Sequence, residues 1–403
     1  MATSTSRLAV SVPKLFTALR VGSITLKHRV VMAPLTRFRA NASHVPQEIA
    51  TTYYSQRASP GTLLITEATF IKDEAGGYDY APGIWSEEQI AAWKNITDAV
   101  HKKGGFIYLQ LWALGRAATP KVMTRKGFKV VSAGNIPMEE GAAVPTPLTK
   151  QEIHQYVEWY AQAAKNAVQK AGFDGVEIHN ANGYLPDQFL QTNSNNRTDE
   201  FGGSVENRSR FTLLIAKAVT DAIGQEKTGI RLSPHGRYQG MRMADDLMEE
   251  QFTHVIKALR DAYPRFAYMH LTEPRIAVEG DPNPGHVEGS IEFARRVWGD
   301  IPGSPFFSAG GYTREQAIDT VEAHGGAIVF GRAFIANPDL PLRLEHNAKL
   351  NKYDRTTFYT GGPKGYTDYP FSEALNATYL PGVFLCSHLA SLLHELSDDL
   401  RDV

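Results

Sequence analysis

The sequence predicts a single-domain α/β fold, a (β/α)8 TIM barrel. Eight short apolar runs rich in β-branched residues alternate along the chain with helical runs. These runs are apolar at consecutive positions and bounded by glycine or proline, as parallel strands covered on both faces are. Polar residues suited to chemistry follow the C-terminal ends of several runs, which is where barrels of this kind carry their active sites.

The strand–helix alternation is regular, and the helices between the expected strands carry start signals. Ser86, Thr149 and Thr313 each stand three residues before a Gln or Glu, which is the spacing of a capping box. The helix after Thr149 has one apolar stripe at helical spacing, and Gly172 is well placed to end it. The expected strands are Arg29–Ala33, Thr62–Thr66, Phe106–Leu111, Gly175–His179, Gly229–Leu232, Phe266–Leu271, Pro305–Ala309 and Ala327–Phe330.

Three segments do not fit a bare barrel. Ala117–Pro147 follows the third strand, and we expect it to cover part of the site; Glu273–Gly289, with three prolines, is a second long loop. The barrel is expected to span residues 1–381, with a helical extension over 382–403. The apolar stripe of that extension either packs on its own barrel or docks on a second protomer, which would make a homodimer. It consists of Leu385, Leu389, Leu392, Leu393, Leu396 and Leu400.

Composition excludes several classes of protein. The 403 residues are 42% hydrophobic and carry a formal net charge of −1, so the chain can bury a sizeable core and has no global attraction to nucleic acid or anionic membrane. Cys386 is the only cysteine, which excludes a disulfide or a cysteine zinc site within the chain. No signal peptide or membrane span is visible, and we expect a cytoplasmic protein.

The end of the fourth strand carries the strongest chemical signal. His179 and Asn182 are spaced so that their donors can converge on one oxygen, and donors aimed at a developing oxyanion are a large catalytic factor. Tyr184 follows closely, and a positioned phenol can deliver a proton. A metal role for His179 is not expected, because no carboxylate or cysteine cluster accompanies it.

Other strand ends carry weaker signals. The Thr36 hydroxyl could bond a flat cofactor at the barrel mouth. The Gln110 amide could pair with the N3–H and O2 edge of an isoalloxazine ring, or it could be a satisfied interior amide. Arg231 could stabilise an anionic reduced flavin, or form an interior ion pair with Glu177, or do both.

The last two strands end in a glycine-rich pattern typical of phosphate sites. Gly310 and Gly311 follow the seventh strand, and Gly331 and Arg332 follow the eighth. Glycine lets backbone N–H groups approach phosphate oxygens, and an arginine adds a bidentate donor. A flavin phosphate and a sugar-phosphate substrate both fit this pattern.

Taken together, these motifs resemble the Old Yellow Enzyme family of flavin-dependent ene-reductases. The similarity runs from about Leu15 to Pro381, and the matching pieces occur in the same order on successive strands. They include Met32–Arg37, Pro82–Ser86, Gln110–Arg116, His179–Tyr184, Arg197–Arg208, Arg231–Pro234, Gly310–Gly311 and Phe330–Arg332.

The resemblance implies bound FMN, reduction by NADPH, and hydride transfer from flavin N5 to the β-carbon of an α,β-unsaturated carbonyl. It implies that Thr36, Gln110 and Arg231 contact the flavin ring, and that Pro34 and Ala68 offer backbone groups to it. Relatives often have glycine in place of Ala68.

On the substrate side, the resemblance implies that His179 and Asn182 hold the carbonyl oxygen and that Tyr184 protonates the α-carbon. Arg275 stands where some relatives have an aromatic residue, so we expect it to favour an acidic or strongly polar substrate. A desaturating or isomerising flavoenzyme and a non-catalytic flavin-binding protein remain alternatives. Further substrate contacts are implied for Tyr78, Trp112, Tyr238 and Tyr359.

Overall fold

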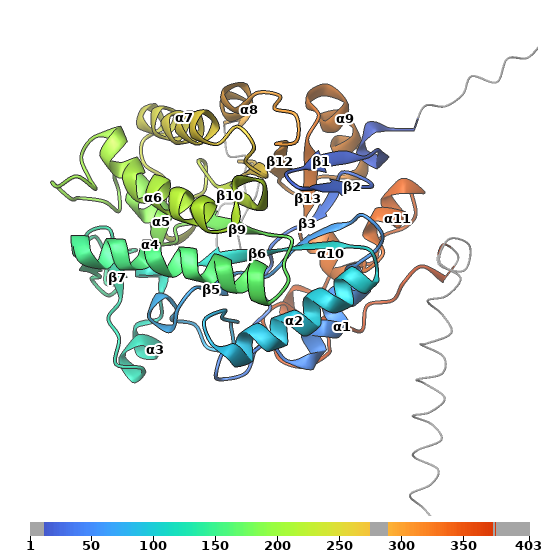
Figure 1. Cartoon of the computed structure of the whole chain (residues 1–403), viewed down its shortest axis with the longest axis horizontal. Coiled ribbons are helices and arrows are strands. Elements are labelled where there is room, and N and C mark those ends of the chain that lie inside the picture. Colours follow the sequence, from blue (N-terminus) through green and yellow to red (C-terminus); the bar gives the residue numbers. More distant parts are fainter. Residues whose placement is uncertain (1–11, 275–288, 374, 376–403) are drawn as a thin grey trace, which may run out of the picture.

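The computed structural model describes residues 12–274, 289–373 and 375, and these form the expected barrel (Figure 1). Each of the eight strands predicted from the sequence is present and overlaps its expected range. Neighbouring strands are parallel, and β4 pairs with both β3 and β6, which closes the barrel. The barrel strands are β3 (Val30–Met32), β4 (Leu63–Ile65), β6 (Phe106–Trp112), β9 (Gly175–Asn180), β10 (Thr228–Leu232), β11 (Tyr268–Thr272), β12 (Phe306–Ala309) and β13 (Ala327–Phe330).

Helices surround the barrel, and all three expected capping boxes are confirmed, at Ser86, Thr149 and Thr313. The helix after Thr149 differs from the expectation, because it changes to a π-helical turn over Asn166–Lys170 before the chain reaches Gly172 at φ +79°. The longer helices are α1 (Glu48–Arg57), α2 (Glu87–Lys102), α4 (Lys150–Lys165), α6 (Val205–Ile223), α7 (Asp245–Ala262), α8 (Glu292–Trp298) and α9 (Arg314–His324).

Short elements lie at both ends of the barrel. The antiparallel hairpin of β1 (Leu19–Val21) and β2 (Ile24–Leu26) hydrogen-bonds to the segments that precede β10 and β12, so it closes the N-terminal end. The remaining short elements are α3 (Pro120–Arg125), α5 (Leu185–Leu190), α10 (Arg332–Ala336), α11 (Leu340–Glu345), β5 (Thr69–Phe70), β7 (Val131–Ser132), β8 (Thr146–Pro147) and 3₁₀ turns at Lys14–Phe16, Asp73–Ala75, Gly115–Ala117, Gln225–Lys227, Tyr238–Gly240 and Arg355–Thr357.

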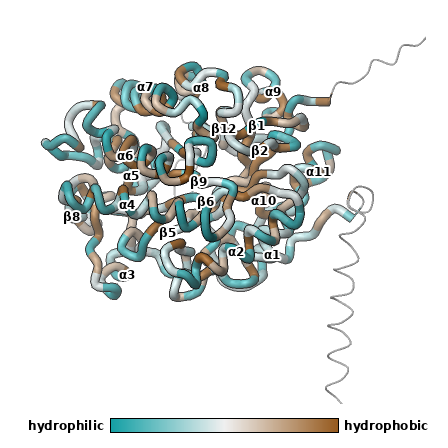
Figure 2. Tube along the Cα trace, in the orientation of Figure 1, coloured by the Kyte–Doolittle hydropathy of each residue, from teal (hydrophilic) through white to brown (hydrophobic). Residues whose placement is uncertain are grey.

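Apolar side chains fill the barrel and the layer between barrel and helices. The Cα trace in Figure 2, coloured by hydropathy, shows many hydrophilic residues along the surrounding helices. Because the hairpin closes one end, the C-terminal end of the strands is the end open to a ligand. Arg275 and the extension over 382–403 lie outside the described residues, so the expectations for them and for the domain boundary stay predictions. None of the helices that the structure describes is both long and apolar enough to cross a membrane.

Candidate active site

Three aromatic side chains meet at the C-terminal end of β9. His179 belongs to β9, and Tyr184 is the residue that caps the N-terminus of α5. Their rings lie 4.8 Å apart at 72°, and the Trp112 ring at the end of β6 lies 4.9 Å from Tyr184 at 89°. The strand end and the helix start therefore bring together the histidine and the tyrosine that the sequence selected, with Asn182 on the turn between them.

The turn that carries Asn182 is fixed by hydrogen bonds from the neighbouring strand. Asn182 has a left-handed backbone, with φ +59°, which is unusual for a residue other than glycine. Its N–H donates to the Ser233 Oγ over 2.7 Å, and its carbonyl accepts from Gln239 Nε2 over 2.8 Å. Both partners follow β10, so this strand sets the position of the turn.

Gly183 is held equally firmly from the helix that follows. Its N–H donates to the Asp187 carboxylate over 2.9 Å, and its carbonyl accepts from Gln188 Nε2 over 2.7 Å. A Cβ at Gly183 would lie 2.6 Å from the Met241 side chain, so only glycine fits here. The turn is therefore organised before any ligand binds. Sequence reasoning did not select Asp187, Gln188 or Gln239.

Burial sets the protonation states of the two candidate catalytic rings. Burial, followed by the charges of Arg231 and His270, lowers the pKa of His179 well below its usual value, so the imidazole is neutral. Burial, followed by Tyr78 and Tyr238, raises the pKa of Tyr184 well above its usual value. A neutral imidazole and a protonated phenol are both able to donate a hydrogen bond at neutral pH.

Inside the barrel, Glu177 is bound by two neutral partners. Gln110 Nε2 donates to its carboxylate over 2.7 Å, and His270 Nδ1 lies 2.8 Å from it. The amide of Gln110 is thus partly satisfied inside the barrel. Among the described residues Arg231 forms no ion pair with Glu177, although its charge helps to lower the pKa of that carboxyl.

The two glycine-rich strand ends lie side by side. Gly311, after β12, has φ +64°, and Arg332 begins α10 directly after β13. A Cβ on Gly311 would lie 3.8 Å from the Arg332 Nη2 atom, so the guanidinium stands over this turn. A left-handed glycine beside an arginine is suited to an anion. Gly310 and Gly331 flank the same two strand ends.

The residues present fit FMN. The Nε of Arg231 and the Nε1 of Trp112 are buried, and neither has a hydrogen-bond partner within the described part of the chain. Such buried donors are rare unless a ligand or water pairs with them. Pro34 and Ala68 are buried just beyond β3 and β4, and Thr36 is half-buried beside them. Arg231, Gln110 and Thr36 would hold the flavin ring, and Gly311 with Arg332 would hold its phosphate.

The expected substrate side is an aromatic wall that extends outward from Trp112. Tyr78 lies 5.6 Å from the Trp112 ring, and Phe38 lies 5.9 Å from Tyr78 and 5.7 Å from Tyr359. Burial raises the pKa of Tyr78, and Tyr238 is the second cause of this rise. Tyr238 therefore lies near Tyr78, on the substrate side. Phe38 joins this wall without having been selected from the sequence.

Two buried arginines position Tyr359 from a distance. The Arg37 guanidinium donates to the carbonyls of Phe358 and Gly365, and the Arg39 guanidinium donates to those of Thr357 and Gly362 among others. These bonds fasten the C-terminal segment around residue 359 to the loop after β3. No local pattern could reveal them, because the partners are more than three hundred residues apart in the sequence.

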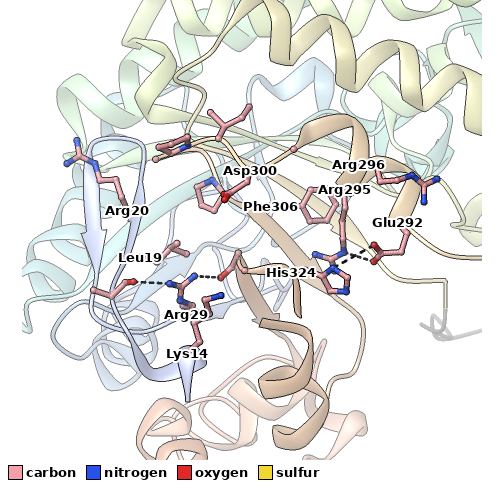
Figure 3. Close-up of a pocket in the computed structure, with 18 residues that line it drawn as sticks. Lys14, Leu19, Arg20, Arg29, Glu292, Arg295, Arg296, Asp300, Phe306 and His324 are labelled. Carbon is pink, nitrogen blue, oxygen red and sulfur yellow. Dashed lines mark hydrogen bonds and ion pairs between the residues drawn. The ribbon is translucent and has the colours of Figure 1, made fainter. Parts of the chain in front are cut away.

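A cavity of about 630 Å³, separate from the candidate active site, lies at the N-terminal ends of β12 and β13 (Figure 3). Two of its arginines hold neighbouring segments together: Arg29 donates to the carbonyls of Ala18 and Gly326, and Arg295 pairs with Glu292. It lies at the opposite end of the strands from Tyr184, so we assign it no catalytic role. Over the described ranges, no group of three or more His, Cys, Asp or Glu side chains could hold a metal ion.

Comparison with known proteins agrees with this geometry. Residues 14–351 match the NADH:flavin oxidoreductase / NADH oxidase family. The NADP-dependent oxidoreductase lnbE of Aspergillus flavus is 52% identical over 372 residues, which cover 89% of this chain and 97% of the relative. The chanoclavine-I aldehyde reductase fgaOx3 of Penicillium roqueforti is 50% identical, with 89% and 96% covered. A probable inactive reductase, easA of Epichloe festucae var. lolii, is 48% identical, with 90% and 97% covered.

Solved structures show the same relationship. Morphinone reductase superposes with a TM-score of 0.81 at 41% identity, covering 90% of this chain and 98% of that one. The Old Yellow Enzyme from Pichia sp. AKU4542 superposes with a TM-score of 0.82 at 38% identity, covering 90% and 94%. The chain therefore belongs to the Old Yellow Enzyme group of the NADH:flavin oxidoreductase / NADH oxidase family, whose cofactors are FMN and NAD(P)H.

Proposed function

We propose that the protein reduces the C=C bond of α,β-unsaturated carbonyl compounds. The observation that carries this proposal is the contact between a neutral His179 and a protonated Tyr184, which flank a turn held by hydrogen bonds from the surrounding structure. Such a reaction needs hydrogen-bond donors for the carbonyl oxygen and an acid for the α-carbon. An unsaturated aldehyde is the preferred carbonyl, because one close relative is named an aldehyde reductase.

In this mechanism the protein binds, orients and protonates the substrate. His179 and Asn182 hold the carbonyl oxygen and stabilise the negative charge that develops on it. Tyr184 delivers its phenolic proton to the α-carbon. FMN, which Arg231, Gln110 and Thr36 would hold, would supply the hydride equivalent for the β-carbon, with NAD(P)H as the source of reducing equivalents. Trp112 and Tyr78 exclude water from one side of the substrate.

A non-catalytic flavoprotein is the second candidate, because one close relative is named a probable inactive reductase. The retained His179, Asn182 and Tyr184 argue against it for this chain. Desaturation or isomerisation could use the same site, and analysis of the products formed under anaerobic conditions distinguishes these reactions from reduction.

The test is anaerobic turnover of an enal with NADPH by wild type and by the double variant His179→Ala/Asn182→Ala. Each lost donor should cost about 2.7–4 kcal/mol in the transition state. The variant should keep its flavin absorption, and the half-exposed His324→Ala serves as the matched control. Unchanged enal turnover in the double variant would reject the assignment, and a wild type that reduces no enal would favour the inactive candidate.

A further inference from the structure

A cavity of about 840 Å³ opens on the catalytic end of the barrel, beside the aromatic wall. Its lining comes from the loop after β3, from Asp79 and Tyr80, and from the C-terminal segment at Tyr359–Gly362. This volume lies within the range of small-molecule sites, roughly 300–1,000 Å³. The cavity is large enough to hold a part of a ligand that contains several rings.

Packed aromatic rings connect the cavity wall with the candidate active site. Phe38 and Tyr359 line it. Phe38 also packs on Tyr78, Tyr78 on Trp112, and Trp112 on Tyr184, with ring centroids 5.9, 5.6 and 4.9 Å apart. One uninterrupted series of rings therefore leads from the candidate proton donor to the cavity wall.

The walls of the cavity are fixed by hydrogen bonds to backbone carbonyls. The Ala40 N–H donates to the Tyr80 carbonyl over 3.0 Å, and Gln47 Nε2 donates to the Arg39 carbonyl over 2.9 Å. The Arg39 guanidinium ties the loop after β3 to the segment of Tyr359. Yet the Tyr80 and Tyr359 side chains are each 53% exposed, so they present aromatic surface to a ligand.

The charges in the wall select the kind of occupant. Its charged residues are Arg39, Glu48 and Asp79. The Arg39 guanidinium is buried and bonded to backbone carbonyls, so it is not available to an anion. Asp79 pairs with Arg125, and Glu48 is exposed. The wall therefore offers the exposed carboxylate of Glu48 and no lining guanidinium that is available to an anion, which disfavours the phosphates of a dinucleotide and favours a neutral or cationic group.

We propose that this cavity is a second substrate subsite, which receives the flat, neutral or cationic distal part of an extended unsaturated aldehyde whose reacting end lies at Tyr184. This inference rests on the proposed ene-reductase function. Tyr80 and Tyr359 supply stacking surface to the distal part, so the subsite gives the enzyme a preference for long substrates over short ones.

The test compares 2-butenal with a biphenyl-substituted propenal. Ala42→Trp fills the cavity and Tyr80→Ala removes stacking surface, while Leu247→Ala, an exposed apolar residue on α7, is the matched control. Each cavity variant should lower kcat/KM for the extended aldehyde about three- to tenfold, which is the range of one aromatic contact. The kcat/KM for 2-butenal and the KM for NADPH should remain at their wild-type values.

Two results overturn the proposal. An equal fall for both aldehydes means that the cavity does not distinguish substrate length, and a raised KM for NADPH assigns the cavity to the dinucleotide. Calorimetric titration of the extended aldehyde into the oxidised, FMN-loaded protein gives the same comparison as dissociation constants. The subsite is therefore tested even if the wild type reduces neither aldehyde, a result that contradicts the proposed function alone.

Discussion

The His270 imidazole lies 2.8 Å from the Glu177 carboxylate, and both side chains are fully buried inside the barrel. Burial lowers the pKa of His270, and although burial opposes the charge on Glu177, His270, Arg231 and Gln110 together lower the pKa of that carboxyl. The pair is therefore an ionised carboxylate that accepts from a neutral imidazole. It joins β9 to β11 across β10, the strand that carries Arg231.

Replacing His270 by Phe should destabilise the protein strongly. The Glu177 carboxylate would remain buried with one of its two partners missing, and leaving a buried acceptor unpaired typically costs about 1–3 kcal/mol, and more when the acceptor is charged. The free energy of unfolding from urea titration of the FMN-loaded protein measures this loss. His324→Phe disrupts a half-exposed contact with Glu292 and should cost less than about 1 kcal/mol. If His270→Phe lowers the free energy of unfolding no more than His324→Phe does, the assigned role of the His270–Glu177 pair is contradicted.

Gln239 should act as a positioning residue for the catalytic turn. Its Nε2 donates to the Asn182 carbonyl, and its side chain also interacts with the Tyr184 hydroxyl, where it opposes the rise in pKa. Gln239 itself has φ +61°, and the Arg116 guanidinium donates to its carbonyl. The surrounding structure thus holds Gln239 in an unfavourable backbone conformation.

Gln239→Leu should lower kcat for enals about tenfold, because the partly buried Asn182 carbonyl loses its side-chain donor, at about 1–3 kcal/mol. Flavin reduction by NADPH should change little. Gln239→Glu keeps the length of the side chain but removes its amide donor, so it should lower kcat much as Gln239→Leu does. A purely structural role would instead lower both half-reactions and the melting temperature together.

Glu67 should make stability depend on pH near neutrality. It lies just beyond β4 and is 4% exposed, and its carboxylate accepts from the Arg37 N–H over 3.2 Å. Burial outweighs the nearby arginines and raises its pKa from 4.5 to about 7. Because the folded pKa is raised, its contribution to stability is full below pH 4.5 and is lost as the pH rises through 7.

Glu67→Gln should remove this dependence, because glutamine keeps an acceptor but cannot ionise. The stability of wild type minus that of the variant should fall by about 1.4 kcal/mol per pH unit between the unfolded pKa of 4.5 and the folded pKa of about 7, and should level off above pH 7. Urea titrations between pH 5.5 and 8.5 measure this difference. Parallel profiles for the two proteins would show that Glu67 is already ionised throughout that range.

The sequence predicts features whose causes are local, and it misses features that depend on distant partners. The barrel strands and the capping boxes follow from patterns within a few residues, and the structure confirms them. Gln239 carries no local signal, because its role depends on a turn 57 residues away in the sequence. The alternatives for Gln110 and Arg231 could not be separated either, since Glu177 takes its partner His270 from a strand 93 residues further along.

Tyr184→Phe should separate the two half-reactions of the proposed cycle. Reduction by NADPH needs no proton from a phenol, so its rate should stay near that of wild type. Enone reduction should slow by about 10²–10⁴, the usual contribution of a positioned acid. The raised pKa of Tyr184 keeps the wild-type phenol protonated, so wild-type turnover should show no loss of this acid up to pH 9.

Substrates should differ in their sensitivity to this change. A nitroalkene forms a stabilised anion that solvent can protonate later, so it should be affected less than a weakly activated enone. Stopped-flow absorbance of the flavin, recorded for each half-reaction separately, measures all of these rates. If reduction by NADPH slows as much as enone reduction, Tyr184 is not the proton donor, and its contacts with His179 and Trp112 serve binding or structure instead.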